Sequence, residues 1–103
     1  MKLAALLFTG AAAIVCLPVH ANLALAQKNA CTACHAVDKK IVGPSYQDVA
    51  KKYADQKGAD AAVAASIKAG GAGKWGPVPM PPQPALSEAD TKALAAWILA
   101  GAK

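Results

Sequence analysis

Apolar residues follow two different patterns along this chain. From Leu3 to Leu17 they form an almost uninterrupted run, whereas after residue 21 they recur three or four positions apart with lysines between them. The first pattern is typical of a secretory signal peptide, and the second of short amphipathic helices. We therefore predict an export signal followed by one small helical domain.

The predicted signal peptide covers residues 1–21. Lys2 precedes the apolar run, and Val19-His20-Ala21 matches the rule for residues before a cleavage site, with Val and Ala at the two key positions. We expect cleavage after Ala21, with cleavage after Ala26 as the second choice. The mature domain would then comprise residues 22–103, and its expected location is the periplasm.

The apolar run is not expected to stay in a membrane. It is shorter than the ~20 residues that a bilayer-spanning helix needs, and no charged stop-transfer segment flanks it. Cys16 would suit a lipoprotein anchor, but Val15 stands where a small residue is required and Pro18 follows closely. We therefore expect no stable membrane insertion.

Four segments of the mature region have the pattern of short helices. The first is expected to run from about Leu23 into a cysteine motif at residues 31–35. The third covers Ala59–Ala69 and has glycines at both ends, which are typical helix boundaries. No internal repeat divides the region, so we expect a single domain.

The second and fourth segments indicate which side chains face the core. The second segment, residues 46–53, places these residues on one helical face: Tyr46, Val49, Ala50 and Tyr53. The fourth begins with a capping box in which Ser87 is the N-cap and Asp90 takes the usual place of Glu. It extends to Gly101, and we expect these residues on its buried face: Ala89, Ala93, Leu94, Trp97 and Ile98.

Cys31-Thr32-Ala33-Cys34-His35 is the attachment signature of a c-type haem. The two thiols can each add to a vinyl group of the haem, and the adjacent imidazole can bind the iron. A redox dithiol would require a thioredoxin-like βαβ pattern, which is missing, and a structural zinc ion would require four ligands. Beyond the motif only Cys16 and His20 are available, both in the predicted signal peptide. We predict one haem c on Cys31 and Cys34, with His35 as an axial ligand of the iron.

A proline-rich loop precedes the fourth helical segment. Five prolines between Pro77 and Pro84 exclude helices and sheet ladders, and they restrict the backbone around Met80. Such loops are often polyproline II ligands or linkers. A haem iron bound by a histidine needs a sixth ligand, however, and Met80 is the sole methionine besides the initiator. We therefore predict Met80 as the second axial ligand, which raises the reduction potential.

Composition and charge agree with a haem protein. Only two Tyr and two Trp remain after the signal peptide, so a haem would supply much of the core, and we expect Trp97 to be ordinary core packing. The formal net charge of +5 falls by one with the loss of Lys2, and it favours an acidic partner surface. The chain has no Arg, and its aromatic residues do not alternate with lysines, so nucleic acid is not expected as a partner.

From Cys31 to Lys103 the chain resembles a bacterial class I cytochrome c of the cytochrome c-551/c-552 type. Besides the cysteine motif, the resemblance rests on three strings: Val42-Gly43-Pro44-Ser45-Tyr46, Trp75-Gly76-Pro77-Val78-Pro79-Met80-Pro81-Pro82 and the terminal Trp97-Ile98. It implies an all-α fold, the small class I cytochrome c fold, with four to five short helices wrapped around one covalently attached haem.

The resemblance also implies roles for three further residues. Pro44 would pack near His35, with a nearby backbone carbonyl accepting a hydrogen bond from the imidazole. Trp75 would donate its indole N–H to a haem propionate, and Gln83 would lie near the Met80 sulfur as a hydrogen-bond donor. Relatives often carry a basic residue at the position of Ser66, so the counter-charge of a propionate at this corner is not assigned.

Together these inferences predict a soluble periplasmic one-electron carrier. We expect it to be a monomer and not an enzyme. The expected donor is a cytochrome bc-type complex, and the expected acceptor is a terminal oxidase, a nitrite reductase or a peroxidase. The alternative is a haem enzyme or gas sensor with an open sixth position, which Met80 in its proline-rich loop disfavours. No general acid/base pair accompanies the haem motif to suggest a substrate site.

Overall fold

The computed structural model describes residue 10 and residues 20–103. These residues form four α-helices and one 3-10 helix: α1 (His20–Lys28), η1 (Cys31–Ala33), α2 (Tyr46–Tyr53), α3 (Ala59–Ala69) and α4 (Glu88–Leu99). In this described part the only β-type pairings are two isolated bridges, so the predicted all-α fold is confirmed. Residues 1–9 and 11–19 of the predicted signal peptide lie outside the described residues. None of the helices described is long and apolar enough to cross a bilayer.

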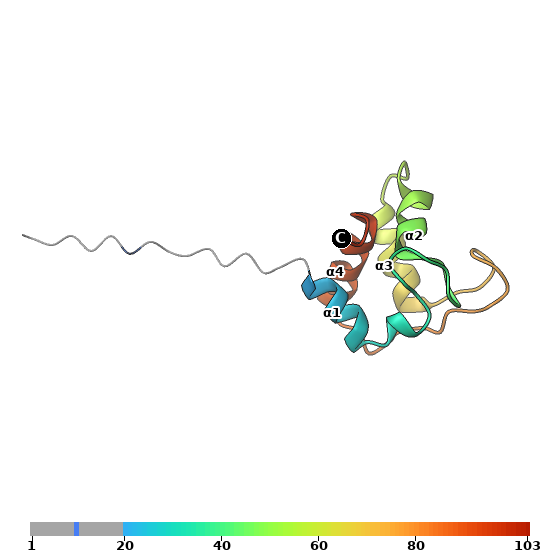
Figure 1. The fold of residues 1–103 in the computed structure, drawn as a ribbon, viewed down its shortest axis with the longest axis horizontal. Helices are drawn as coiled ribbons and strands as arrows, with labels where there is room; N and C mark the ends of the chain where they lie inside the picture. Colours follow the sequence, from blue (N-terminus) through green and yellow to red (C-terminus); the bar gives the residue numbers. More distant parts are fainter. Residues whose placement is uncertain (1–9, 11–19) are drawn as a thin grey trace, which may run out of the picture.

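Helix α4 is the central element and packs against α1, α2 and α3 (Figure 1). The Ser87 Oγ accepts a hydrogen bond from the Asp90 N–H over 3.1 Å, so the predicted N-cap is confirmed. Buried on α4 are Thr91, Leu94, Ala95, Trp97 and Ile98. The placement of Ala89 on the buried face was wrong, because this residue is exposed. Three helices contact α4 from different directions, so its buried surface is wider than a single stripe and shifts toward Thr91 and Ala95.

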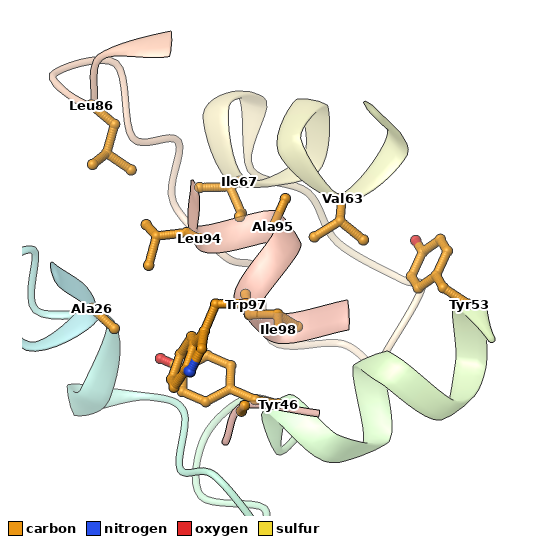
Figure 2. Packing of buried hydrophobic residues seen from close by; sticks show 11 residues of the cluster. Ala26, Tyr46, Tyr53, Val63, Ile67, Leu86, Leu94, Ala95, Trp97 and Ile98 are labelled. Carbon is orange, nitrogen blue, oxygen red and sulfur yellow. The ribbon is translucent and has the colours of Figure 1, made fainter. Parts of the chain in front are cut away.

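Helices α2 and α3 have the residue bounds that the sequence predicts. The Ser45 Oγ, which is buried, accepts from the Asp48 N–H over 3.0 Å and caps the start of α2. Both α3 boundaries are glycines with positive φ, Gly58 at 74° and Gly70 at 69°. The face of α3 that carries Val63 and Ile67 points toward α4 (Figure 2).

The first predicted helix does not continue into the cysteine motif. Helix α1 ends at Lys28, and the motif begins a separate turn, η1, after Ala30 adopts a left-handed conformation with φ of 60°. The left-handed Ala30 ends the helical hydrogen-bond pattern, since its N–H donates to the Gln27 carbonyl over 3.1 Å, three residues back instead of four. The Asn29 Nδ2 adds a second hydrogen bond, over 2.9 Å, to the Leu25 carbonyl that already accepts from the Asn29 N–H. The motif is therefore presented by an independent turn.

Two aromatic residues join α2 to α4 in the core. The rings of Tyr46 and Trp97 lie 5.1 Å apart and tilted by 60° (Figure 2). The indole Nε1 of Trp97 donates to the Lys103 carbonyl over 3.2 Å, and its ring is buried, so its predicted role in core packing is confirmed. Among the described residues, the Tyr46 hydroxyl is the one buried side-chain polar atom without a hydrogen-bond partner. Burial raises the pKa of Tyr46 to about 12, and the charge of a Cys31 thiolate would add to this rise.

Candidate haem site

A cavity of about 310 Å³ lies between the cysteine motif, the proline-rich loop and the inner sides of three helices. The motif contributes Cys31, Cys34 and His35 to its wall, and the loop contributes Met80. Helices α2, α3 and α4 contribute apolar side chains: Val49, Val63, Ile67, Leu94 and Ile98. The fold therefore gathers the predicted haem-attachment residues and both predicted iron ligands around one largely apolar space.

The imidazole of His35 is oriented by the backbone. Its Nδ1 lies 2.7 Å from the Pro44 carbonyl oxygen, which only accepts, so the ring proton resides on Nδ1 and the lone pair of Nε2 is available for a metal. The ring also stacks on Tyr46, with centroids 5.5 Å apart and planes at 26°. The predicted carbonyl partner is thus that of Pro44 itself.

Gly43 is a residue that the sequence interpretation did not single out at this site. A Cβ on Gly43 would lie 2.6 Å from Cε1 and 3.0 Å from Nδ1 of His35, so a side chain there would displace the imidazole. The Gly43 N–H also donates to the Cys34 carbonyl over 2.8 Å, which holds the segment against the motif. Its place immediately before Pro44 was the available signal.

The two cysteines of the motif are partly buried free thiols. The Cys31 carbonyl accepts hydrogen bonds from the N–H groups of Cys34 and His35, at 3.1 and 3.0 Å, and this turn brings both thiols to the cavity wall. Burial raises the pKa of the Cys31 thiol. Because one turn places both cysteines on the cavity wall, the pair is suited to form two thioether bonds to a group that occupies the cavity.

Met80 is anchored to the end of α3 through its backbone. Its N–H donates to the Gly71 carbonyl over 2.8 Å, and the Gly71 N–H donates back to the Met80 carbonyl over 3.1 Å. A Cβ on Gly70 would strike the Met80 carbonyl oxygen and lie 2.7 Å from the Pro82 nitrogen. The prolines were predicted to exclude sheet pairing from this loop. The bridge between Met80 and Gly71 is an exception, because Met80, unlike the prolines on either side of it, has an N–H to donate.

Of the remaining residues considered in the sequence, Trp75 and Ser66 line the cavity and Gln83 does not. Trp75 lines the cavity and is 37% exposed, and the Lys52 Nζ lies 4.4 Å from the centre of its ring. Gln83 is not part of the cavity wall, and its Nε2 donates to the Pro81 carbonyl over 3.3 Å. The hydrogen bond from Gln83 to the Met80 sulfur therefore stays a prediction. Ser66 lines the cavity from α3.

The chemistry of this wall fits a covalently attached haem. It combines two thiols, an imidazole with a free Nε2, a thioether and apolar side chains, which are the groups that hold a c-type haem. The described part of the chain contains no group of three or more His, Cys, Asp or Glu side chains arranged to hold a metal ion. The cavity wall contains one histidine and one methionine, His35 and Met80, the two residues predicted to bind the iron.

Comparisons with known proteins agree with this geometry. Residues 23–102 match the sequence profile of the family described as cytochrome c. The chain is 49% identical over 92 residues to cytochrome c-552 of Nitrosomonas europaea, covering 89% of each chain. It is 58% identical over 69 residues to cytochrome c-551 of Azotobacter vinelandii, covering 67% of this chain and 83% of the relative. The crystal structure of wild-type Nitrosomonas europaea cytochrome c552 superimposes with a TM-score of 0.75 at 52% identity, covering 77% of this chain and 98% of that one.

Proposed function

Because this chain belongs to the cytochrome c family and is of the cytochrome c-551/c-552 type, we propose that it carries single electrons between redox proteins in the periplasm. The family carries one covalently bound haem c, which supplies an iron that takes up and releases one electron. The observation that supports a carrier is that His35 and Met80, from two separate segments, line the same cavity. An iron bound by both side chains would have no open position for a substrate.

The cysteine motif has the roles of attachment and proximal ligation in this proposal. Cys31 and Cys34 would form the thioether bonds, and the Nε2 of His35 would bind the iron. The Pro44 carbonyl, 2.7 Å from Nδ1, holds the ring proton on that nitrogen and so leaves the lone pair of Nε2 free for a metal. Because the acceptor is a backbone carbonyl, its position does not depend on the rotamer of another side chain.

Met80 and Trp75 have their roles on the loop side. The paired hydrogen bonds between Met80 and Gly71 fix the backbone that presents the thioether, which would serve as the second iron ligand. Trp75, which lines the cavity, would donate its indole N–H to a haem propionate. A site held this firmly requires little rearrangement during electron transfer.

The surface near the cavity supports docking of an acidic redox partner. Val78 is 59% exposed on the loop and Val42 is 49% exposed beside the motif segment, and both line the cavity mouth. Lys39 and Lys40 are exposed next to Val42 in the sequence. The proposed donor is a cytochrome bc-type complex, and the proposed acceptor is a terminal oxidase, a nitrite reductase or a peroxidase.

The packing of α1 favours export with cleavage after Ala21. Ala26 is 0% exposed in the core, and Leu23 and Leu25 pack against the same cluster. Cleavage after Ala26 would remove all three side chains, whereas cleavage after Ala21 keeps them in residues 22–103. The intact mass of the protein isolated from a periplasmic fraction tests this. We expect a chain that begins at Asn22 and carries one haem that acidified organic solvent cannot extract.

Replacement of Met80 tests the carrier function against an enzyme or gas sensor. The oxidised protein should show the weak near-infrared band of charge transfer from sulfur to iron, and its reduced form should not bind carbon monoxide. Met80→Ala should remove the band, lower the reduction potential and permit carbon monoxide binding. Ile41→Ala, an exposed apolar position outside the cavity wall, is the matched control and should change none of these properties. Wild-type protein that binds carbon monoxide readily at neutral pH would contradict the proposal.

A further inference from the structure

The wall of the cavity contains cationic side chains and no acidic one. Lys40 and Lys74 line it, and no Asp or Glu does. A haem brings two propionates, and a carboxylate beside apolar walls requires a cation or hydrogen-bond donors. Ser66, on the α3 wall, offers a hydroxyl group but no charge. The two possible counter-ions on this wall are therefore Lys40 and Lys74.

Lys74 is held at this wall by α2. Its Nζ donates to the Tyr53 hydroxyl over 2.7 Å and stands 5.3 Å from the centre of the Tyr53 ring. Tyr53 is only 5% exposed and lies at the edge of the core cluster, so the group that holds the ammonium is itself fixed (Figure 2). An ammonium has three N–H groups, and this contact leaves two of them for another acceptor.

A second lysine holds the backbone of the same segment. The Lys52 Nζ donates to the Lys74 carbonyl over 3.1 Å while it covers the ring of Trp75. Lys74 and Trp75 are thereby presented at one edge of the cavity. Within residues 20–103 the one ion pair joins Glu88 to Lys92, so Lys74 has no carboxylate partner in that part of the protein.

We propose that Lys74, positioned by Tyr53, binds a haem propionate as its counter-ion beside the indole N–H of Trp75. The proposal rests on the haem site described above and assigns a residue that the cysteine motif and the proline-rich loop do not identify. The cation comes from the loop before Trp75, whereas Ser66 on α3 offers only an uncharged hydroxyl group. Lys74 favours the ionised propionate, and Tyr53 limits the conformations that the lysine must lose on binding.

The pH dependence of the reduction potential of the holoprotein tests this assignment. Ionisation of a propionate stabilises the oxidised iron, so the potential falls through a step as the pH rises past the pKa of that group. Lys74→Gln should move the step upward by about one pH unit, a tenfold change in proton affinity, because an opposite charge nearby lowers the pKa of a carboxylate. Tyr53→Phe should give a smaller shift in the same direction, and Lys74→Arg should leave the step near its original position.

Two further variants separate a local contact from a general change of charge. Lys51→Gln removes the same charge from an exposed site on α2 outside the cavity wall, and the step should stay in place. Ser66→Lys in the Lys74→Gln background should move the step back, since Ser66 lines the same cavity. In the holoprotein the other titratable side chains facing the cavity are Lys40, Tyr46 and Tyr53. They are the same in all of these variants, apart from Tyr53 in Tyr53→Phe.

The position of the pH step in Lys74→Gln and in Lys51→Gln decides whether Lys74 binds the propionate. A step that does not move in Lys74→Gln, or one that moves as far in Lys51→Gln, would remove Lys74 from the propionate. The near-infrared band recorded on the same samples reports ligation by Met80 independently. A band that persists beside an unmoved step rejects Lys74 alone, whereas a band that is missing from the wild type rejects the proposed function.

Discussion

Replacing Gly70 by alanine should displace Met80, the proposed second iron ligand, by moving the backbone of its loop. Gly70 has φ of 69° and ψ of −169°, a region that is almost exclusive to glycine and costs other residues about 1–3 kcal/mol. The new Cβ would also meet the Met80 carbonyl and lie 2.7 Å from the Pro82 nitrogen, and these are backbone atoms that cannot rotate away. The loop must therefore move away from the end of α3.

The expected loss of unfolding free energy is the sum of the backbone strain at Gly70 and the hydrogen bonds that this movement breaks. The two hydrogen bonds between Gly71 and Met80 each contribute about 0.5–1.5 kcal/mol, so with the backbone strain we expect a loss of about 2–6 kcal/mol. This is a large part of the stability of a small domain, which is typically about 5–15 kcal/mol. We also expect a weaker near-infrared band and partial binding of carbon monoxide by the reduced form, because Met80 would leave the iron more often.

Chemical denaturation of the oxidised holoprotein measures the loss, and absorption of the same samples measures ligation. Gly71→Ala is the matched control, because a Cβ there meets no atom within 4 Å and the change should stay within about 1 kcal/mol of the wild type. If Gly70→Ala unfolds within about 0.5 kcal/mol of Gly71→Ala and keeps the full band, the close approach of α3 and the loop does not position Met80.

Three further substitutions test other parts of the fold. Tyr46→Phe should increase the free energy of unfolding by about 1 kcal/mol, because it removes a buried hydroxyl without a partner. This advantage should grow between pH 10 and pH 12, where the unfolded phenol ionises and the folded one stays neutral, and denaturation at both pH values checks it. Ser45→Ala should cost about 1–2 kcal/mol and more than Ser87→Ala in thermal unfolding, since both remove an N-cap but only Ser45 is buried. Gly43→Ala should tilt the His35 ring and alter the visible spectrum, and an unchanged spectrum would contradict the 2.6 Å approach.

Helices bounded by local chemistry were predictable from the sequence. Helices α2 and α3 have the expected bounds because Ser45 caps the first and Gly58 and Gly70 limit the second, and these effects act within a few residues. The end of α1 was not predictable in the same way. It depends on a left-handed Ala30, a conformation that alanine rarely adopts.

Features that depend on distant residues were the ones missed. Ala89 fits the apolar pattern of α4, yet it is exposed because burial there is decided by three neighbouring helices. The contact of Lys74 with Tyr53 joins residues far apart in sequence, and no spacing rule identifies it. The cavity-lining positions of Cys31, Cys34, His35 and Met80 could be anticipated because their chemistry is specific to one cofactor.

The His35 ring stacks on Tyr46, and the Tyr46 ring meets Trp97 at a tilt, so two ring contacts of 5.5 and 5.1 Å connect the imidazole to α4. Undocking of α4 would therefore release the ring that supports the imidazole, even though α4 contains neither of the two proposed iron ligands. The visible absorption of the haem should therefore change when α4 separates from the rest of the domain. An absorption measurement at one wavelength would follow the attachment of the chain terminus, without any added label.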